Sequence, residues 1–181
     1  MQSLWLQPAG NILAGRIALG WLAATALWLS LERPLVAATQ IHNQSATPAT
    51  ISFLATDPDS PTLSVPVTVS FRTTGGNTTR TWQLDVQATS GANMASCPNA
   101  IPVSQIQVSC VSTSVANGGT GACTAPFNLS TGLQMIASGR EGTGNAVPYL
   151  VVLNFTLQDS WRYIATNSPC TVNLTYQIIA N

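Results

Sequence analysis

Alternation of apolar and polar residues is the clearest pattern in this chain. Apolar side chains occupy every second position over residues 63–71 and again over residues 82–88. Successive side chains of a strand point to opposite faces, so each run predicts a β-strand with one buried face. The turn residues at 75–77 (Gly-Gly-Asn) predict that the two strands form a hairpin. Pro66 lacks a backbone N–H, so the first strand should lie at a sheet edge or contain a bulge there.

Two further runs near the C-terminus follow the same rule. Residues 149–157 carry a complete apolar row, and Leu150 and Val152 add apolar side chains on the opposite face, so this strand should be the most central. Residues 171–178 alternate throughout and predict a final strand. Weaker strand candidates are residues 49–55, 101–111 and 124–136.

Short strands, frequent turn residues and the lack of a helical stripe after residue 38 predict an all-β fold. We expect a single antiparallel β-sandwich, Ig-like or pilin-like, over residues 49–181. Residues 39–48 are mostly polar and are predicted to form a flexible segment ahead of it.

The N-terminus has the features of a secretory signal peptide. Arg16 precedes an uncharged apolar run over residues 17–31, and small residues at 36–38 suit signal peptidase. We expect cleavage after Ala38, with residues 1–38 removed and the mature protein making no membrane contact. The alternative is an uncleaved membrane anchor, although the run is shorter than the roughly 20 residues that span a bilayer.

Charge is sparse, at 7% of residues, and the chain contains no lysine. Four scattered arginines in the mature part cannot form a basic face for a phosphate backbone, so nucleic-acid binding is not expected. The apolar fraction of 45% is sufficient for a folded core.

An even number of cysteines after a signal peptide predicts two disulfides in an oxidising compartment. The preferred pairing joins Cys110 to Cys123 across the predicted turn at 116–119, and therefore Cys97 to Cys170. The rival pairing is Cys97–Cys110 with Cys123–Cys170. A zinc site would require closer CxxC-type pairs than these four cysteines provide.

No arrangement of residues predicts a catalytic site or a cofactor. His42 is the sole histidine and lies in the polar segment, which is a poor place for a catalytic triad. Asp57 and Asp59 are predicted to stabilise a turn, with a calcium site as the alternative. A small secreted carbohydrate-active enzyme remains an alternative, with acids that would come from Asp85, Glu141 or Asp159, although Asp85 is predicted to face outward without a carboxylate partner.

Residues 81–86 (TWQLDV) contain a Trp-x-Leu motif at Trp82 and Leu84, and residues 173–178 (NLTYQI) contain Leu174 and Tyr176. These two motifs resemble those of the WxL-domain family of bacterial cell-surface proteins, with tyrosine where tryptophan is usual in the second. Secreted pilin-like and spore-coat-like subunits are the neighbouring resemblance. The WxL resemblance implies a secreted β-sandwich that holds to the cell wall without a covalent link.

We therefore expect a noncatalytic secreted or cell-surface protein with a structural or adhesive role, located outside the cell or in its envelope. Its expected partners are a cell-wall polymer, surface proteins or a second copy of itself. The alternative is a pilus-like or coat-like subunit that assembles by strand exchange. Residues 39–47 hold only Ile41 as a large apolar side chain, which makes them a poor donor strand.

Overall fold

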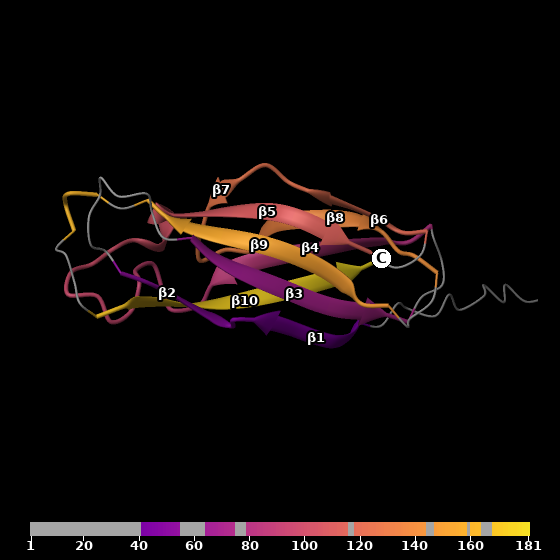
Figure 1. Cartoon of the computed structure of the whole chain (residues 1–181), viewed down its shortest axis with the longest axis horizontal. Coiled ribbons are helices and arrows are strands. Elements are labelled where there is room, and N and C mark those ends of the chain that lie inside the picture. Colours follow the sequence, from indigo (N-terminus) through magenta and orange to yellow (C-terminus); the bar gives the residue numbers. More distant parts are fainter. Residues whose placement is uncertain are drawn as a thin grey trace, which may run out of the picture. The chain divides into compact units, whose positions relative to one another are not determined.

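The strands pair into two antiparallel sheets that face each other across a common core (Figure 1). The computed structural model describes residues 41–54, 64–74, 79–115, 118–143, 147–158, 160–163 and 168–181. All strand pairs in these ranges are antiparallel, which confirms the predicted all-β sandwich. The predicted signal peptide, residues 1–38, lies outside the described residues.

Each sheet has five strands. One, here called the β9 sheet, contains in spatial order β1 (Ile41–Thr47), β3 (Ser64–Thr73), β9 (Tyr149–Leu157), β5 (Ile106–Ser114) and β7 (Phe127–Asn128). The other, here called the β4 sheet, contains β2 (Thr50–Phe53), β10 (Cys170–Ala180), β4 (Thr81–Ala88), β8 (Gln134–Arg140) and β6 (Thr120–Cys123). A short 3₁₀ helix, η1 (Val103–Gln105), precedes β5.

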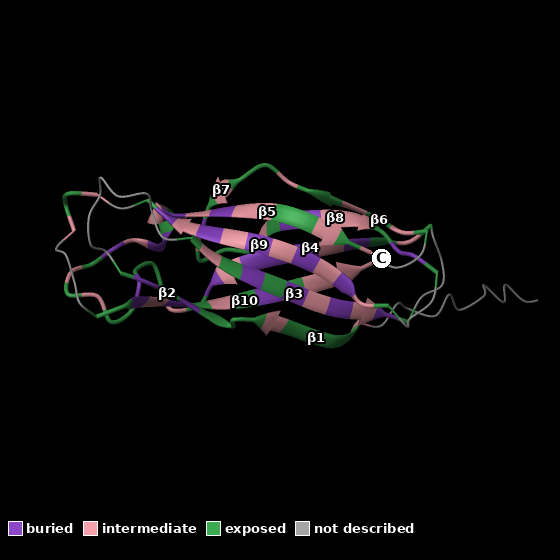
Figure 2. Cartoon of the chain, viewed as in Figure 1, coloured by how far each residue is buried: buried purple, intermediate pink, exposed green. Residues whose placement is uncertain are grey.

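The core follows the alternation in the sequence. Every second residue of β9 is buried, and β9 occupies the centre of its sheet, as predicted (Figure 2). Alternate residues of β3 and β4 are buried in the same way. The apolar faces of the two sheets therefore meet and remove each other's side chains from water.

The predicted hairpin between residues 63–71 and 82–88 is wrong. β3 belongs to the β9 sheet, whereas β4 belongs to the β4 sheet. The turn at residues 75–77 lies outside the described residues. Alternation identifies the buried face of each strand but not its partner, and these two strands face each other across the core instead of pairing edge to edge.

The expected flexible segment at residues 39–48 contains a strand instead. Residues 41–47 form β1, which pairs with β3 from Thr68 to Thr73. Backbone hydrogen bonds hold this edge strand, and its mostly exposed polar side chains give no alternation to detect.

The constraint predicted for Pro66 holds locally. β3 is the second strand of its sheet, but β1 pairs with it only as far as Thr68. Pro66 lies beyond that point and is opposite Asn154 of β9, in a continuous register without a bulge. At Pro66, which has no N–H to donate, β3 therefore has a paired strand only on the β9 side, and its other side is a sheet edge.

Trp82 joins the two sheets. It is 1% exposed, and its indole ring packs edge-on against Phe71 and Tyr149 of the β9 sheet, at centroid distances of 5.5 Å and 6.0 Å. The indole Nε1 donates a hydrogen bond to the carbonyl oxygen of Thr120, 3.2 Å away. This ring therefore fixes β4 against the opposite sheet and also against the edge strand β6.

Two glycines leave room for this ring. Gly139 of β8 is opposite Trp82, and Gly121 of β6 is opposite Gly139. A Cβ atom on Gly121 would lie 3.2 Å from the indole and 2.6 Å from Thr113 Oγ1, and one on Gly139 would collide with the carbonyl oxygen of Thr120. The indole thus lies over a row of bare backbone on its own sheet.

The disulfides join Cys97 to Cys170 and Cys110 to Cys123, the pairing preferred from the sequence. The predicted hairpin that was expected to bring Cys110 and Cys123 together is wrong, however, because β5 and β6 belong to different sheets. Cys110 lies in the β9 sheet and Cys123 in the β4 sheet, so this bridge connects the two layers. Cys97 lies in the loop after β4 and holds that loop to the start of β10.

Replacement of Trp82 by alanine should destabilise the domain by about 3–5 kcal/mol, because it leaves a large cavity between the sheets. Chemical denaturation measures this loss of unfolding free energy. Trp161→Ala is the matched control, since Trp161 is 75% exposed, and its effect should stay within about 0.5 kcal/mol. Equal effects of the two substitutions would contradict the core position of Trp82.

Removal of the Cys97–Cys170 bridge should destabilise the domain more than removal of the Cys110–Cys123 bridge. The bridges close loops of 73 and 13 residues, for which chain entropy gives about 4 and 3 kcal/mol respectively. Paired cysteine-to-alanine variants, compared by denaturant unfolding, measure the difference. Nonreducing peptide mapping checks the connectivity itself, and a peptide that links Cys97 to Cys110 would show that the pairing is wrong.

Candidate functional site

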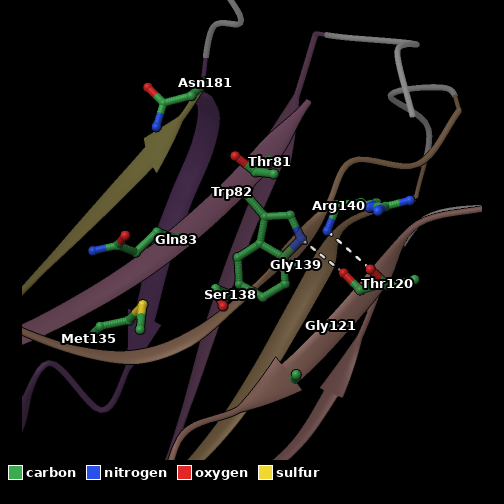
Figure 3. A pocket seen from close by; sticks show the side chains of 11 residues that line it. Thr81, Trp82, Gln83, Thr120, Gly121, Met135, Ser138, Gly139, Arg140 and Asn181 are labelled. Carbon is green, nitrogen blue, oxygen red and sulfur yellow. Dashed lines mark hydrogen bonds between the residues drawn. The ribbon is translucent and has the colours of Figure 1, made fainter. Parts of the chain in front are cut away.

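A cleft of about 450 Å³ opens where strands β10, β4, β8 and β6 reach one end of their sheet (Figure 3). β4 begins there at Thr81, and β8 ends there at Arg140. The backbones of Thr81 and Asn181 exchange two hydrogen bonds of 2.9 Å, which fixes the end of the chain beside the start of β4. The cleft is thus built on paired strands, whose positions the sheet determines.

Strand register arranges the lining side chains in two rows on the outer face of the β4 sheet. Gln83 is opposite Ser138, and Ser138 is opposite Ala122. In the next row, Thr81 and Thr120 both pair with Arg140. These rows lie on the face opposite the Trp82 ring, because residues 81 and 83 alternate with residue 82.

The lining is polar and almost uncharged. Hydroxyl and amide groups come from Thr81, Gln83, Thr120, Ser138 and Asn181. Arg140 is exposed and supplies a positive charge, while Met135, 43% exposed, supplies an apolar surface. Such a lining can exchange hydrogen bonds with a hydroxyl-rich ligand and attract a carboxylate through the guanidinium.

Asp85 holds one of the lining side chains in place. Its Oδ1 accepts a hydrogen bond of 2.7 Å from Gln83 Nε2. Asp85 was predicted to face outward, and its bond to Gln83 agrees with that face of β4, but neighbouring groups cover it and it is only 6% exposed. The β4–β8 register shifts between Leu84 and Asp85, which changes the neighbours of the Asp85 side chain from those of a regular ladder. Since the amide nitrogen is engaged, Gln83 presents its carbonyl oxygen as the remaining acceptor.

Glu141, the other acidic candidate that the structure describes, does not line this cleft. Glu141 follows β8 and is fully buried, and its backbone N–H bonds the carbonyl oxygen of Arg80. Asp57, Asp59 and Asp159 lie outside the described residues. His42 is exposed on β1, opposite Arg72. Within the described ranges, no three His, Cys, Asp or Glu residues lie close enough to hold a metal ion.

The two motifs that suggested a family resemblance are neighbours in the structure. β4 carries Trp82 and Leu84, and β10 carries Leu174 and Tyr176; the two strands pair antiparallel from Leu174 to Ala180. Trp82 and Leu84 are fully buried, Tyr176 is nearly so, and Leu174 is half-buried. All four are therefore packing residues. The two rows of polar side chains lie on the other face of the same strands, and Trp82 also borders the cleft (Figure 3).

A second groove of about 410 Å³ lies between the loop after β4, η1 and the segment after β7. Asn93, Ser104, Ser130 and Thr131 contribute its polar groups, and Val103 and Leu129 its apolar ones. Its lining includes no charged residue among those described, and loops form most of its wall. The cleft at the strand ends is the better-defined binding surface.

No protein-family model, curated protein or solved structure matches the chain. The two disulfides indicate an oxidising environment of the kind found outside the cytoplasm. Among the described residues there is no helix with the length and apolar character needed to cross a membrane.

Tyr176 carries a buried hydroxyl that has no hydrogen-bond partner among the described residues. Burial raises the pKa of this hydroxyl above its ordinary value. The unfolded chain ionises Tyr176 near pH 10, and the folded chain ionises it only at higher pH, so this residue makes stability fall as pH rises above about 10.

We expect Tyr176→Phe to leave the unfolding free energy at pH 7 unchanged or to raise it by up to about 1 kcal/mol, because it removes an unsatisfied polar group. The variant should also lose less stability than the wild type above pH 10. Tyr149→Phe is the control: the Tyr149 hydroxyl accepts a 2.7 Å hydrogen bond from the Gly142 backbone, and its loss should destabilise by about 1 kcal/mol. Equal destabilisation by both variants at pH 7 would mean that the Tyr176 hydroxyl has a partner.

Proposed function

We propose that this chain is a noncatalytic extracellular protein that binds a hydroxyl-rich polymer of the bacterial cell wall through the cleft at the ends of β4 and β8. The observation that carries the proposal is the lining of this cleft, in which two rows of neutral hydrogen-bonding side chains surround one arginine. Sugar hydroxyls pair with such groups as both donors and acceptors.

Each part of the lining has a role in this proposal. Gln83, held by Asp85, offers a carbonyl oxygen in a fixed position. Met135 offers an apolar surface to the C–H face of a sugar ring. Arg140 attracts the carboxylates that wall polymers carry, and its guanidinium has no ion-pair partner in the part of the chain that the structure describes.

Other features support an extracellular location and a WxL-like role. The apolar N-terminal run has the pattern of a secretion signal, and the two disulfides suit an oxidising compartment. The two strands that carry the WxL-like motifs, β4 and β10, are neighbours in one sheet, so the two motifs lie together. Noncovalent retention on the wall follows from this proposal.

The alternatives receive less support. β1 pairs with β3 of its own chain, which does not favour its release as a donor strand. The described lining of the cleft contains no aspartate or glutamate, and glycoside hydrolysis uses a pair of such acids. A glycan panel assayed for hydrolysis tests the enzyme alternative directly, and turnover there would overturn the noncatalytic proposal.

The purified secreted protein should be retained on isolated cell walls at physiological salt, as measured by cosedimentation. The double variant Gln83→Ala/Arg140→Ala should bind at least about tenfold more weakly, since it loses one neutral and one charged hydrogen-bonding group. The control is Gln107→Ala/Arg162→Ala, which removes the same side-chain types away from the cleft. No retention of the wild type, or an equal loss in both double variants, would refute the proposal.

A further inference from the structure

The C-terminal half of β10 has an open edge. On one side, β10 pairs with β4 from Leu174 to Ala180. On the other side it pairs with β2, but only from Cys170 to Asn173. Among the described residues, positions 174–180 therefore have no strand neighbour on the β2 side, and the β4 sheet ends there.

The direction of the backbone groups identifies what this edge offers. Asn173 and Asn181 form their backbone hydrogen bonds toward β4. Because successive residues of a strand present backbone groups to alternate sides, odd-numbered residues between them bond β4 and even-numbered residues face the open side. The residues whose backbone N–H and C=O groups point toward the open edge are Leu174, Tyr176, Ile178 and Ala180.

One of these groups already has a partner from a side chain. Gln44 Nε2 donates a hydrogen bond of 2.9 Å to the carbonyl oxygen of Tyr176. Gln44 lies on β1 where the β1–β3 register shifts between His42 and Ser45. A side-chain amide thus occupies the position that the N–H of an added strand would take.

We propose that this edge of β10 pairs antiparallel with the same edge of a second copy of the chain. No side chain of residues 174–181 carries a charge, so the side chains of two copies do not repel each other, whereas natural sheet edges commonly carry charged side chains that prevent such pairing. A two-fold axis at the contact sets the even-numbered residues of one copy opposite those of the other. Leu174 and Ile178 are only half-buried in one copy, and a neighbouring strand covers them further.

The opposite sheet favours a second copy over a single added peptide. Its edge on the same margin is β1, whose residues are mostly exposed (Figure 2). Ile41 and Ala46 of β1 are also half-buried apolar residues. The same two-fold axis brings β1 of one copy toward β1 of the other. A second copy therefore extends both sheets, whereas a single peptide strand would cover only the edge of β10.

Light scattering and sedimentation of the wild type at concentrations up to about 1 mM should show a reversible dimer. Ala180→Pro should weaken dimerisation at least tenfold, because it removes an N–H on the open side and no hydrogen bond to β4. Ile179→Lys should also weaken dimerisation at least tenfold, because the two added charges repel each other. This second variant tests the proposal if the proline variant does not fold. Gln44→Ala should strengthen dimerisation severalfold, since it frees the Tyr176 carbonyl.

The matched control is Gln87→Lys, which adds the same charge to the outer face of β4, one strand in from the edge; it should dimerise nearly as well as the wild type. A wild type that stays monomeric, or a dimer that Ile179→Lys leaves intact, would overturn the proposal. Hydrogen exchange supplies a further check. Slow exchange of the Ile178 and Ala180 amides in dilute monomer would mean that a segment of the same chain covers the edge, which would also overturn it.

Discussion

The contact of the Trp82 indole with both sheets is the interaction on which the rest of this structure depends. On one side the ring packs against Phe71 and Tyr149, which themselves stack at 5.0 Å. On the other it lies over Gly139 and Gly121, and its nitrogen bonds the Thr120 carbonyl. One side chain therefore contacts both layers, and it adds to the backbone ladders that place β8 and β6 beside β4. The cleft is built on these same strands and Trp82 borders it, so its geometry is linked to packing inside the core.

Side-chain alternation predicted the fold class and most of the core, because burial is a local property of each strand. The central position of β9 followed from apolar residues on both of its faces. Strand pairing was harder to predict. The runs at 63–71 and 82–88 alternate in the same way whether the two strands are neighbours in one sheet or lie in opposite sheets. The cysteine pairing illustrates the same limit, since proximity of Cys110 and Cys123 was expected from a hairpin and arises instead from stacking of the two layers.

The sequence contained little that could identify the cleft. Outward positions of β4 predicted that Thr81 and Gln83 face solvent, but Ser138 and Arg140 lie beyond residue 136, where the weak strand candidate at 124–136 ended, although β8 extends to Arg140. Neutral threonine, serine and glutamine residues are common across the surface, so none of them indicates a site until strand register places them in adjacent rows. The outward face of Asp85 was predicted from alternation, but its burial was not, because cover by neighbouring groups on that face leaves no trace in the periodicity of the strand.

The two layers are also joined covalently at both margins. At one margin, Cys110 and Cys123 connect β5 to β6. At the opposite margin, the chain itself crosses from β1 in one sheet to β2 in the other within the few residues between Thr47 and Thr50. A force that separates the sheets must therefore break the disulfide if it acts at one margin. If it acts at the other margin, it must pull strands β1 and β2 out of their sheets. This construction gives mechanical strength that does not depend on how much surface the core buries.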